Sequence, residues 1–323
     1  MTTAAETPAK ANPAATDSGD SLPGFVFALS AYFLWGFLPF YLKAVDHIGA
    51  IEVVAHRILW SVPIAGGWIL WLGRTADLKR ALRDWRILGM AAVTATLISI
   101  NWSIYVWAIA NDRALEGSLG YYINPLFTIM LGALVLREKV TRLQLAAIIS
   151  AFVAVAILTW EGGGLPLVSL GLVFSWGGYA YFRKTLPVGP NQSFFLEVLL
   201  LAPVALVYLL WQTLSGDRSF FGDGSWTDTG LLLFAGVATA IPLILYANGA
   251  KLLRLSTIGV MQYIVPTMIF LIAVFVFKEP FGWVRLLAFG FIWLALILYV
   301  SSILNERRRL RANLPLIEPG TRT

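Results

Sequence analysis

The sequence of 323 residues contains no cysteine and only two histidines, His47 and His56. The lack of cysteine excludes disulfides, thiolate zinc sites and cysteine nucleophiles. Charged residues are also scarce, at 13% of the chain, against about 25% in soluble domains. Hydrophobic residues make up 58%, and the mean hydropathy of +0.75 leaves too little polar material to cover a water-facing surface. The chain is therefore predicted to fold in a lipid bilayer.

Apolar stretches follow one another along most of the chain, each close to the ~20 residues that a helix needs to cross the hydrocarbon layer. Transmembrane β-strands are shorter and alternate apolar with polar residues, so helices are the only spanning structure that fits. The predicted fold class is an all-α membrane protein with ten transmembrane helices. The expected spans are Gly24–Leu42, Ile51–Leu72, Ile87–Ala110, Gly117–Leu136, Leu143–Trp160, Gly162–Phe182, Asn191–Leu214, Thr229–Ala250, Leu255–Phe277 and Leu286–Leu304.

The basic residues between these spans predict the orientation of the chain. Of the 24 Lys and Arg residues, 18 fall in the termini and even-numbered loops, and five fall in the odd-numbered loops. This bias predicts that both termini are cytoplasmic. Because the basic residues separate apolar runs, the net charge of +6 marks topology and does not indicate nucleic-acid binding. Residues 1–23 are expected to be a disordered cytoplasmic tail, and residues 305–323 a basic cytoplasmic tail.

The chain contains an internal repeat with an offset of 141 residues. Tyr-Ile-Asn-Pro at 122–125 recurs as Tyr-Ile-Val-Pro at 263–266, and Trp35-Gly36 aligns without a gap with Trp176-Gly177. Apolar helices match one another by composition, but constant spacing across these markers favours a duplication. Residues 24–160 and 165–304 are therefore predicted to be two five-helix repeats. An odd number of crossings inverts the second repeat, the arrangement that lets one site open alternately to either side.

Two motifs extend this pattern to a known family. Phe-Leu-Trp-Gly at 33–36 and the segment from Pro266 to Glu279, on ten helices in two repeats, resemble the drug/metabolite transporter superfamily with EamA repeats. The segments HRILWS (56–61) and NWSIYVWAI (101–109) resemble its RarD subfamily more closely. The resemblance implies a permease of the bacterial cytoplasmic (inner) membrane that carries small organic metabolites or drugs, often outward.

Ionisable residues inside the predicted spans are the first candidates for function. Arg57 lies about six residues into its helix, roughly 9 Å deep, and is expected to recognise an anionic or strongly polar group. The alternatives are that it reaches outward to lipid headgroups or pairs with Glu52. His56 and Glu197 occupy equivalent repeat positions and are candidate coupling groups, with a structural carboxylate as the alternative for Glu197. Inverted repeats should hold Arg57 and Glu197 about 12 Å apart across the central cavity, without direct contact.

Aromatic and amide side chains near the middle of the spans are expected to line this cavity, although lipid-facing or packing roles remain the alternative for each. Pro125 and Pro266 each release a backbone carbonyl and are candidate hinges, with simple packing as the alternative. Arg137-Glu138 and Lys278-Glu279 are expected to be interfacial anchors. The candidate substrate-binding residues, with Arg57, are Trp35, Asn101, Tyr105, Tyr122, Asn124, Trp176, Tyr246, Gln262 and Tyr263.

The pattern predicts a secondary transporter for a small organic metabolite or drug that works by alternating access, with proton-coupled efflux as one form. A channel or a non-transporting membrane scaffold is the alternative. The spans contain no Asp pair, no His-Glu-x-x-His and no Gly-x-Ser-x-Gly, so no enzyme is expected, and Gly162-Gly163-Gly164 lacks the Gly-Lys-Ser/Thr of a phosphate-binding loop. No cofactor and no metal are expected. The expected partners are a small-molecule substrate and the bilayer, and a homodimer stays open.

Overall fold

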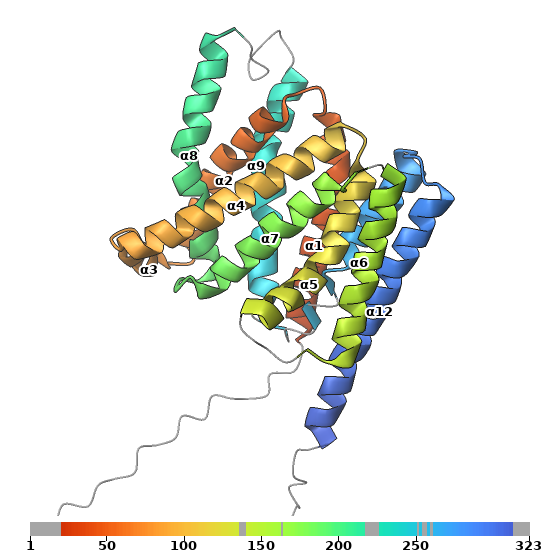
Figure 1. The fold of residues 1–323 in the computed structure, drawn as a ribbon. Helices are drawn as coiled ribbons and strands as arrows, with labels where there is room; N and C mark the ends of the chain where they lie inside the picture. The colour runs from red at the N-terminus through yellow and green to blue at the C-terminus, as the bar shows by residue number, and fades with distance from the viewer. Residues whose placement is uncertain are drawn as a thin grey trace, which may run out of the picture.

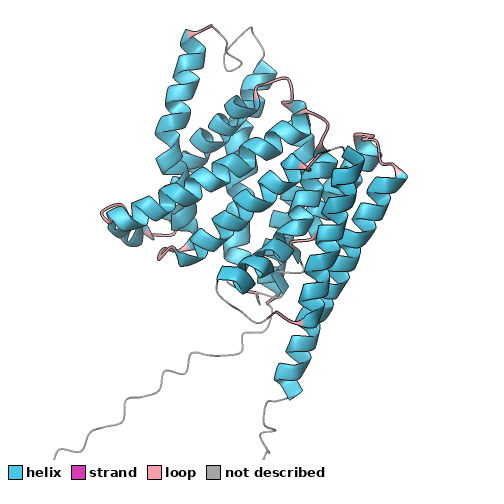
Figure 2. Cartoon of the chain, viewed as in Figure 1, coloured by secondary structure: helices cyan, strands magenta, loops and turns pink. Residues whose placement is uncertain are grey.

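The computed structural model describes residues 21–135, 140–162, 164–216, 226–250, 252–253, 257–258 and 261–312. Within these ranges the regular structure is entirely helical, which confirms the predicted all-α membrane class (Figures 1 and 2). The helices are α1 (Leu22–Ala44), α2 (Ala50–Trp71), α3 (Thr75–Ala81), α4 (Trp85–Ala110), α5 (Ala114–Val135), α6 (Arg142–Gly162), α7 (Leu167–Thr185), α8 (Pro190–Leu214), α9 (Trp226–Ala250), α11 (Ile264–Leu271), the π-helix η1 (Ile272–Val276) and α12 (Trp283–Ala312).

Local sequence signals set several of the helix ends. The Ser21 hydroxyl accepts the N–H of Gly24 at the start of α1, and the Asp84 carboxylate accepts the N–H of Arg86 at the start of α4. Gly73 and Gly216 follow the ends of α2 and α8 with positive φ values of 65° and 81°. This backbone conformation favours glycine, and it turns the chain out of each helix.

Seven of the described helices are long and apolar enough to cross a membrane: α1, α2, α4, α6, α8, α9 and α12. The expected spans 117–136 and 162–182 correspond to α5 and α7, but α7 begins only at Leu167 because Gly162 ends α6. The ninth span differs most from the expected continuous helix 255–277. A turn at Gln262 and Tyr263 precedes α11, and the π-helix η1 follows it directly.

The structure also extends the helical part of the chain beyond the sequence prediction. Helix α12 continues to Ala312, so residues 305–312 of the expected basic C-terminal tail are helical. Residues 1–20 and 313–323 of the two expected tails lie outside the described residues. The short helix α3 lies in a loop where no helix was expected. Asp77 in its first turn and Lys79 and Arg80 in its last turn match the helix dipole, and Ala81 anchors it in the core.

Helices at equivalent repeat positions pack against each other. Helix α6 lies along α12, as Figure 1 shows, and α2 likewise contacts α8, while α5 contacts α11. Two contacts join residues that are 141 positions apart: the Ser150 hydroxyl donates to the carbonyl of Phe291 at 2.8 Å, and the rings of Tyr122 and Tyr263 stack with centroids 6.3 Å apart. Contact between equivalent residues is what a two-fold axis between the halves produces.

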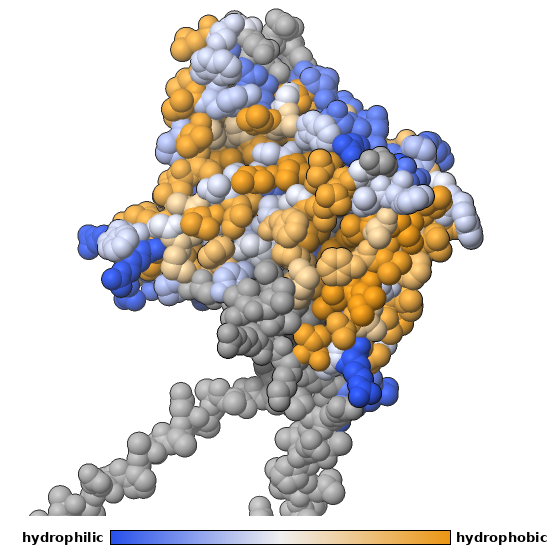
Figure 3. Space-filling view, in the orientation of Figure 1, coloured by the Kyte–Doolittle hydropathy of each residue, from blue (hydrophilic) through white to orange (hydrophobic). Residues whose placement is uncertain are grey.

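The outer surface of the bundle is strongly apolar between its polar ends. In Figure 3 a hydrophobic area covers the flank over α6 and α12, and hydrophilic residues gather at the ends of the helices. Phe152 on α6 and Ile297 on α12 are 59% and 62% exposed there. A soluble protein rarely leaves so much apolar surface open, whereas lipid tails cover it at no cost.

Candidate functional site

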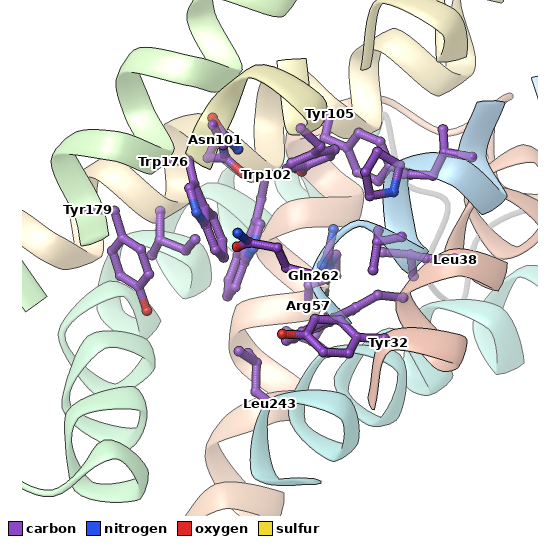
Figure 4. Close-up of a pocket in the computed structure, with 18 residues that line it drawn as sticks. Tyr32, Leu38, Arg57, Asn101, Trp102, Tyr105, Trp176, Tyr179, Leu243 and Gln262 are labelled. Carbon is purple, nitrogen blue, oxygen red and sulfur yellow. Dashed lines mark hydrogen bonds between the residues drawn. The ribbon is translucent and has the colours of Figure 1, made fainter. Parts of the chain in front are cut away.

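A cavity of about 120 Å³ lies inside the bundle, where α1, α2, α4, α5, α7, α9 and α11 meet. One water molecule needs roughly 10–15 Å³ of such volume, so the cavity has room for several waters or a small ligand. Figure 4 shows the aromatic and amide side chains that converge on it. The sequence candidates that line it are Trp35, Arg57, Asn101, Tyr105, Asn124, Trp176, Gln262 and Pro266.

Arg57 is the most unusual group in this wall. Its side chain is 3% exposed, its Nε donates to the hydroxyl of Thr239 at 2.9 Å, and its guanidinium lies 5.0 Å from the ring centre of Trp102. Nη1 has no hydrogen-bond partner within the part of the chain that the structure describes, and no described carboxylate lies within 4.0 Å. Arg57 is therefore part of the cavity wall and does not reach the lipid headgroups. Its buried charge has no counter-charge among the described residues.

The alternative partner of Arg57, Glu52, is engaged elsewhere. The Glu52 carboxylate accepts a hydrogen bond of 2.6 Å from Nε2 of Gln212 on α8. His56 accepts a 3.0 Å hydrogen bond at Nδ1 from the indole of Trp60, one turn further along α2. Glu52, His56, Trp60 and Gln212 all border a second hollow between α2 and α8, so His56 is not part of the central wall.

Asn101 ties α4 to α7 beside the cavity. Its Nδ2 donates to the carbonyl of Leu172 at 3.1 Å and to the hydroxyl of Ser175 at 2.9 Å, while its Oδ1 accepts from Tyr121 at 3.4 Å. The neighbouring Tyr105 hydroxyl is buried and has no partner among the described residues. Asn101 therefore has a structural role in this conformation as well as a place in the wall.

Three of the candidate tyrosines lie behind the wall instead of lining it. Tyr122 shares a 2.9 Å hydrogen bond with the hydroxyl of Thr267 and stacks on Tyr263, so this pair joins α5 to α11. Tyr246 packs behind Trp35, with ring centroids 5.5 Å apart. The sequence analysis chose these residues for their depth near the middle of the spans, but depth does not fix the side of the helix from which a side chain projects, and these three do not line the cavity.

Ten lining residues were missed from the sequence, and five of them have polar or aromatic side chains. Thr239 and Trp102 contact Arg57 directly, and the other three are tyrosines at 32, 121 and 179. The internal repeat could have indicated two of them. Tyr121 is equivalent to the candidate Gln262, and Thr239 is equivalent to Ile98; all four residues line the cavity. The two halves thus fill equivalent wall positions with different side chains.

Glu197 lies one hydrogen bond away from the cavity. Its Oε2 accepts from the Tyr179 hydroxyl at 3.2 Å, and Nη1 of Arg183 is 3.8 Å from the same oxygen. Its Oε1 accepts from Ser193 at 3.2 Å, and its side chain is almost fully buried. Glu197 and Arg57 are not in contact, in line with the sequence expectation, and Tyr179 stands between Glu197 and the cavity.

The two candidate hinge prolines occupy different places in their helices. Pro125 is buried inside α5, but Pro266 lies in the first turn of α11, not midway along a continuous helix. A proline in the first turn removes no intrahelical hydrogen bond, so the repeat does not give the two prolines equal backbone effects. Pro266 lines the cavity and Pro125 does not.

Glu279 joins the two halves at one end of the bundle. Its carboxylate accepts the backbone N–H groups of Ala114 and Leu115 at 2.7 Å and 3.0 Å, at the first turn of α5. The side chain is 6% exposed, so Glu279 is a buried helix cap and not an interfacial anchor, whereas Lys278 beside it is exposed. The equivalent residues Arg137 and Glu138 lie outside the described residues. We call the contact of Glu279 with the N–H groups of Ala114 and Leu115 the latch.

Comparison with known proteins gives a family for this architecture. The EamA-like transporter family matches the chain twice, at residues 22–160 and 164–301. The chain belongs to the EamA-like transporter family. Proteins named RarD from Salmonella typhi and Escherichia coli K12 are each 37% identical over 293 residues, which is 91% of this chain and 99% of theirs. The RarD resemblance deduced from the sequence is therefore confirmed.

Two further relatives are named as a transporter and as a RarD protein. A Bacillus subtilis protein named uncharacterized transporter YojE is 37% identical over 88% of this chain and 96% of its own length. A Pseudomonas aeruginosa protein named chloramphenicol-sensitive protein RarD is 29% identical over 85% of this chain and 92% of its own. A crystal structure of a protein with 16% identity has a TM-score of 0.56 over 87% of this chain and 98% of its own, which supports the fold alone.

Proposed function

We propose that this EamA-family protein is a secondary transporter that moves a small organic metabolite or drug across the bacterial inner membrane by alternating access. One observation carries the proposal: helices from both halves line one central cavity, and its wall contains a buried charge. A scaffold has no need for such a cavity, and unpaired buried charge is costly to keep without a use.

In this proposal residues 24–160 and 165–304 form two five-helix repeats of opposite orientation, ten helices in all, with both termini in the cytoplasm. The packing of α2 on α8, α5 on α11 and α6 on α12 supports a two-fold relation between the halves. The contacts of Ser150 with Phe291 and of Tyr122 with Tyr263 support the same 141-residue register. An inverted pair can exchange conformations about a fixed central site, which is the physical basis of alternating access.

The latch would close the extracellular side in the conformation seen here. With cytoplasmic termini, the start of α5 and the segment after η1 both face outward, and Glu279 connects them across the two halves. The exposed pair Lys43–Asp112, at 2.7 Å, lies at the same end and contributes little by itself. Opening to the outside would then require the Glu279 carboxylate to leave the two N–H groups of α5.

Glu197 is the residue that we propose for proton coupling in an efflux cycle. It is nearly fully buried, and it contacts the cavity wall through the hydroxyl of Tyr179. Protonation of Glu197 would remove its attraction to Arg183 and change the hydrogen bond that holds Tyr179 in the wall. A proton could in this way alter the site without direct contact between Glu197 and substrate.

A two-step experiment tests the transport proposal. A thermal-shift screen of small organic metabolites and drugs on the purified protein first identifies a compound that binds. Proteoliposomes loaded with this compound in unlabelled form are then tested for counterflow of the labelled form. A carrier exchanges the two and transiently accumulates label; a channel or a scaffold does not, and absence of counterflow with a bound compound would overturn the proposal.

A further inference from the structure

We infer that the central cavity binds a small organic anion, with its carboxylate paired to Arg57 and its planar apolar part against the aromatic wall. The inference rests on the proposed function, because it names the chemical class that the transporter would carry. It comes from the charge balance of the cavity, its unpaired donors and the chemistry of its walls.

The charge balance is one-sided. Among the described residues that line the cavity, Arg57 alone carries a formal charge, and no described carboxylate lies within 4.0 Å of its guanidinium. The nearest polar partner is the neutral hydroxyl of Thr239. Removing a charge from water without an opposite charge is unfavourable, and an anionic ligand is the group that would offset it.

The hydrogen bonding of Arg57 is incomplete. Nε donates to the hydroxyl of Thr239, and the guanidinium carbon lies 5.0 Å from the centre of the Trp102 ring. Nη1 is left without a partner in the described structure, and so is the hydroxyl of Tyr105. An arginine that donates only at Nε still has N–H groups for a carboxylate, the acceptor whose geometry matches the planar guanidinium.

The rest of the wall suits a planar apolar body, and among the described residues it offers no carboxylate to a cation. In Figure 4, Trp176 and Tyr179 lie on one side of the lining side chains, and Tyr32 and Leu38 lie on the other, with Trp102 between the two pairs. A protonated amine would meet the charge of Arg57 and find no described carboxylate in the wall. The amides of Asn101 and Gln262 supply polar groups for orientation, but they do not change the net charge.

Three probes of matched shape test the inference: phenylacetate, neutral 2-phenylacetamide and cationic phenethylamine. Binding to the purified full-length protein is measured by thermal shift and by quenching of tryptophan fluorescence. We expect phenylacetate to bind at least about tenfold more tightly than the amide, equivalent to about 1.4 kcal/mol, and the amine to bind more weakly still. Equal binding of the three probes, or absence of binding by phenylacetate, would overturn the inference.

Variants then locate the charge preference. Arg57→Gln should weaken phenylacetate binding by at least about tenfold and leave the amide within a factor of about three. Arg113→Gln is the matched control, since Arg113 also lies over a tryptophan ring, Trp107 at 5.5 Å, but outside the cavity. Unchanged phenylacetate binding in folded Arg57→Gln protein contradicts the inference. If Arg57→Gln does not fold, Arg57→Lys should keep the order anion over amide with weaker binding, because a point charge lacks the planar donor edge.

The outcomes separate this inference from the transport proposal. Counterflow of a neutral or cationic compound, with no effect of Arg57→Gln, would support the carrier function and contradict the anion site. Charge-dependent binding of phenylacetate without counterflow would keep the anion site and remove the carrier function.

Discussion

Replacement of Glu279 by Gln should open the extracellular side of the protein. The Glu279 carboxylate makes two hydrogen bonds to backbone N–H groups at the positive end of α5, at 2.7 Å and 3.0 Å. Hydrogen bonds to a charged group contribute ~1.5–3 kcal/mol each, and the helix dipole adds ~0.3–1 kcal/mol. Gln keeps one acceptor oxygen but loses the charge and the second acceptor, so we expect the closed conformation to lose about 2 kcal/mol. This changes the ratio of closed to open molecules by about 30-fold.

The lack of native cysteine makes this change directly measurable. A single cysteine in place of Val265, a half-buried lining residue, reports whether the cavity is accessible from outside. Intact cells are treated with a membrane-impermeant maleimide, and the labelling rate is compared with and without Glu279→Gln. The rate should rise several-fold, up to the about 30-fold limit set by the population shift.

The matched control is Glu161→Gln. Glu161 is also a carboxylate at this end of the bundle, but its oxygen contacts the side chain of Arg285 at 3.6 Å and no helix N-terminus. Its replacement should leave the labelling rate at Val265→Cys unchanged. An unchanged rate in folded Glu279→Gln protein, or an equal rise in both variants, would refute the latch as the element that holds the outside closed.

Three further substitutions test other parts of the structure. Pro125→Ala should restore a hydrogen bond inside α5 and slow counterflow at normal membrane insertion, whereas Pro266→Ala, in the first turn of α11, should change the rate little; the reverse order would contradict the observed helix starts. Glu197→Gln should abolish transport driven by a proton gradient but keep counterflow, and loss of both would point to a structural role. Gly236→Ala should destabilise the protein by ~1–3 kcal/mol in a thermal-unfolding assay, since a Cβ there would lie 2.5 Å from the α2 backbone, while Gly230→Ala has open space and serves as the control.

The sequence predicts the transmembrane class well because composition and charge act over whole spans. Long uncharged runs with basic loops leave only helices across a bilayer, and the helices lie close to the expected ranges. The structure departs from the prediction at places where a few residues determine whether a helix continues or ends. Gly162 continues α6, and a turn at Gln262 and Tyr263 interrupts the ninth span.

The candidate site is only partly predictable for a geometric reason. Burial depth follows from position along a span, so Arg57, Trp35 and Trp176 could be placed near the cavity from the sequence. The direction of a side chain around its helix depends on how the helices pack. Adjacent residues differ by about 100° around an α-helix, and Tyr121 therefore lines the cavity while Tyr122 turns toward Tyr263.

The central claim is that the outer end of the bundle must open for transport, and a cross-link across this end tests it most directly. Lys43 on α1 and Phe277 at the end of η1 belong to different halves, and the Lys43 Nζ lies 6.0 Å from the centre of the Phe277 ring. Cysteines at these two positions, the only ones in the chain, can be joined by a short bis-methanethiosulfonate reagent without altering Glu279. The account predicts that the cross-link stops counterflow of the compound found in the thermal screen, that this compound still stabilises the cross-linked protein, and that a reductant restores exchange. Counterflow at the original rate with cross-linking complete would contradict alternating access through the central cavity.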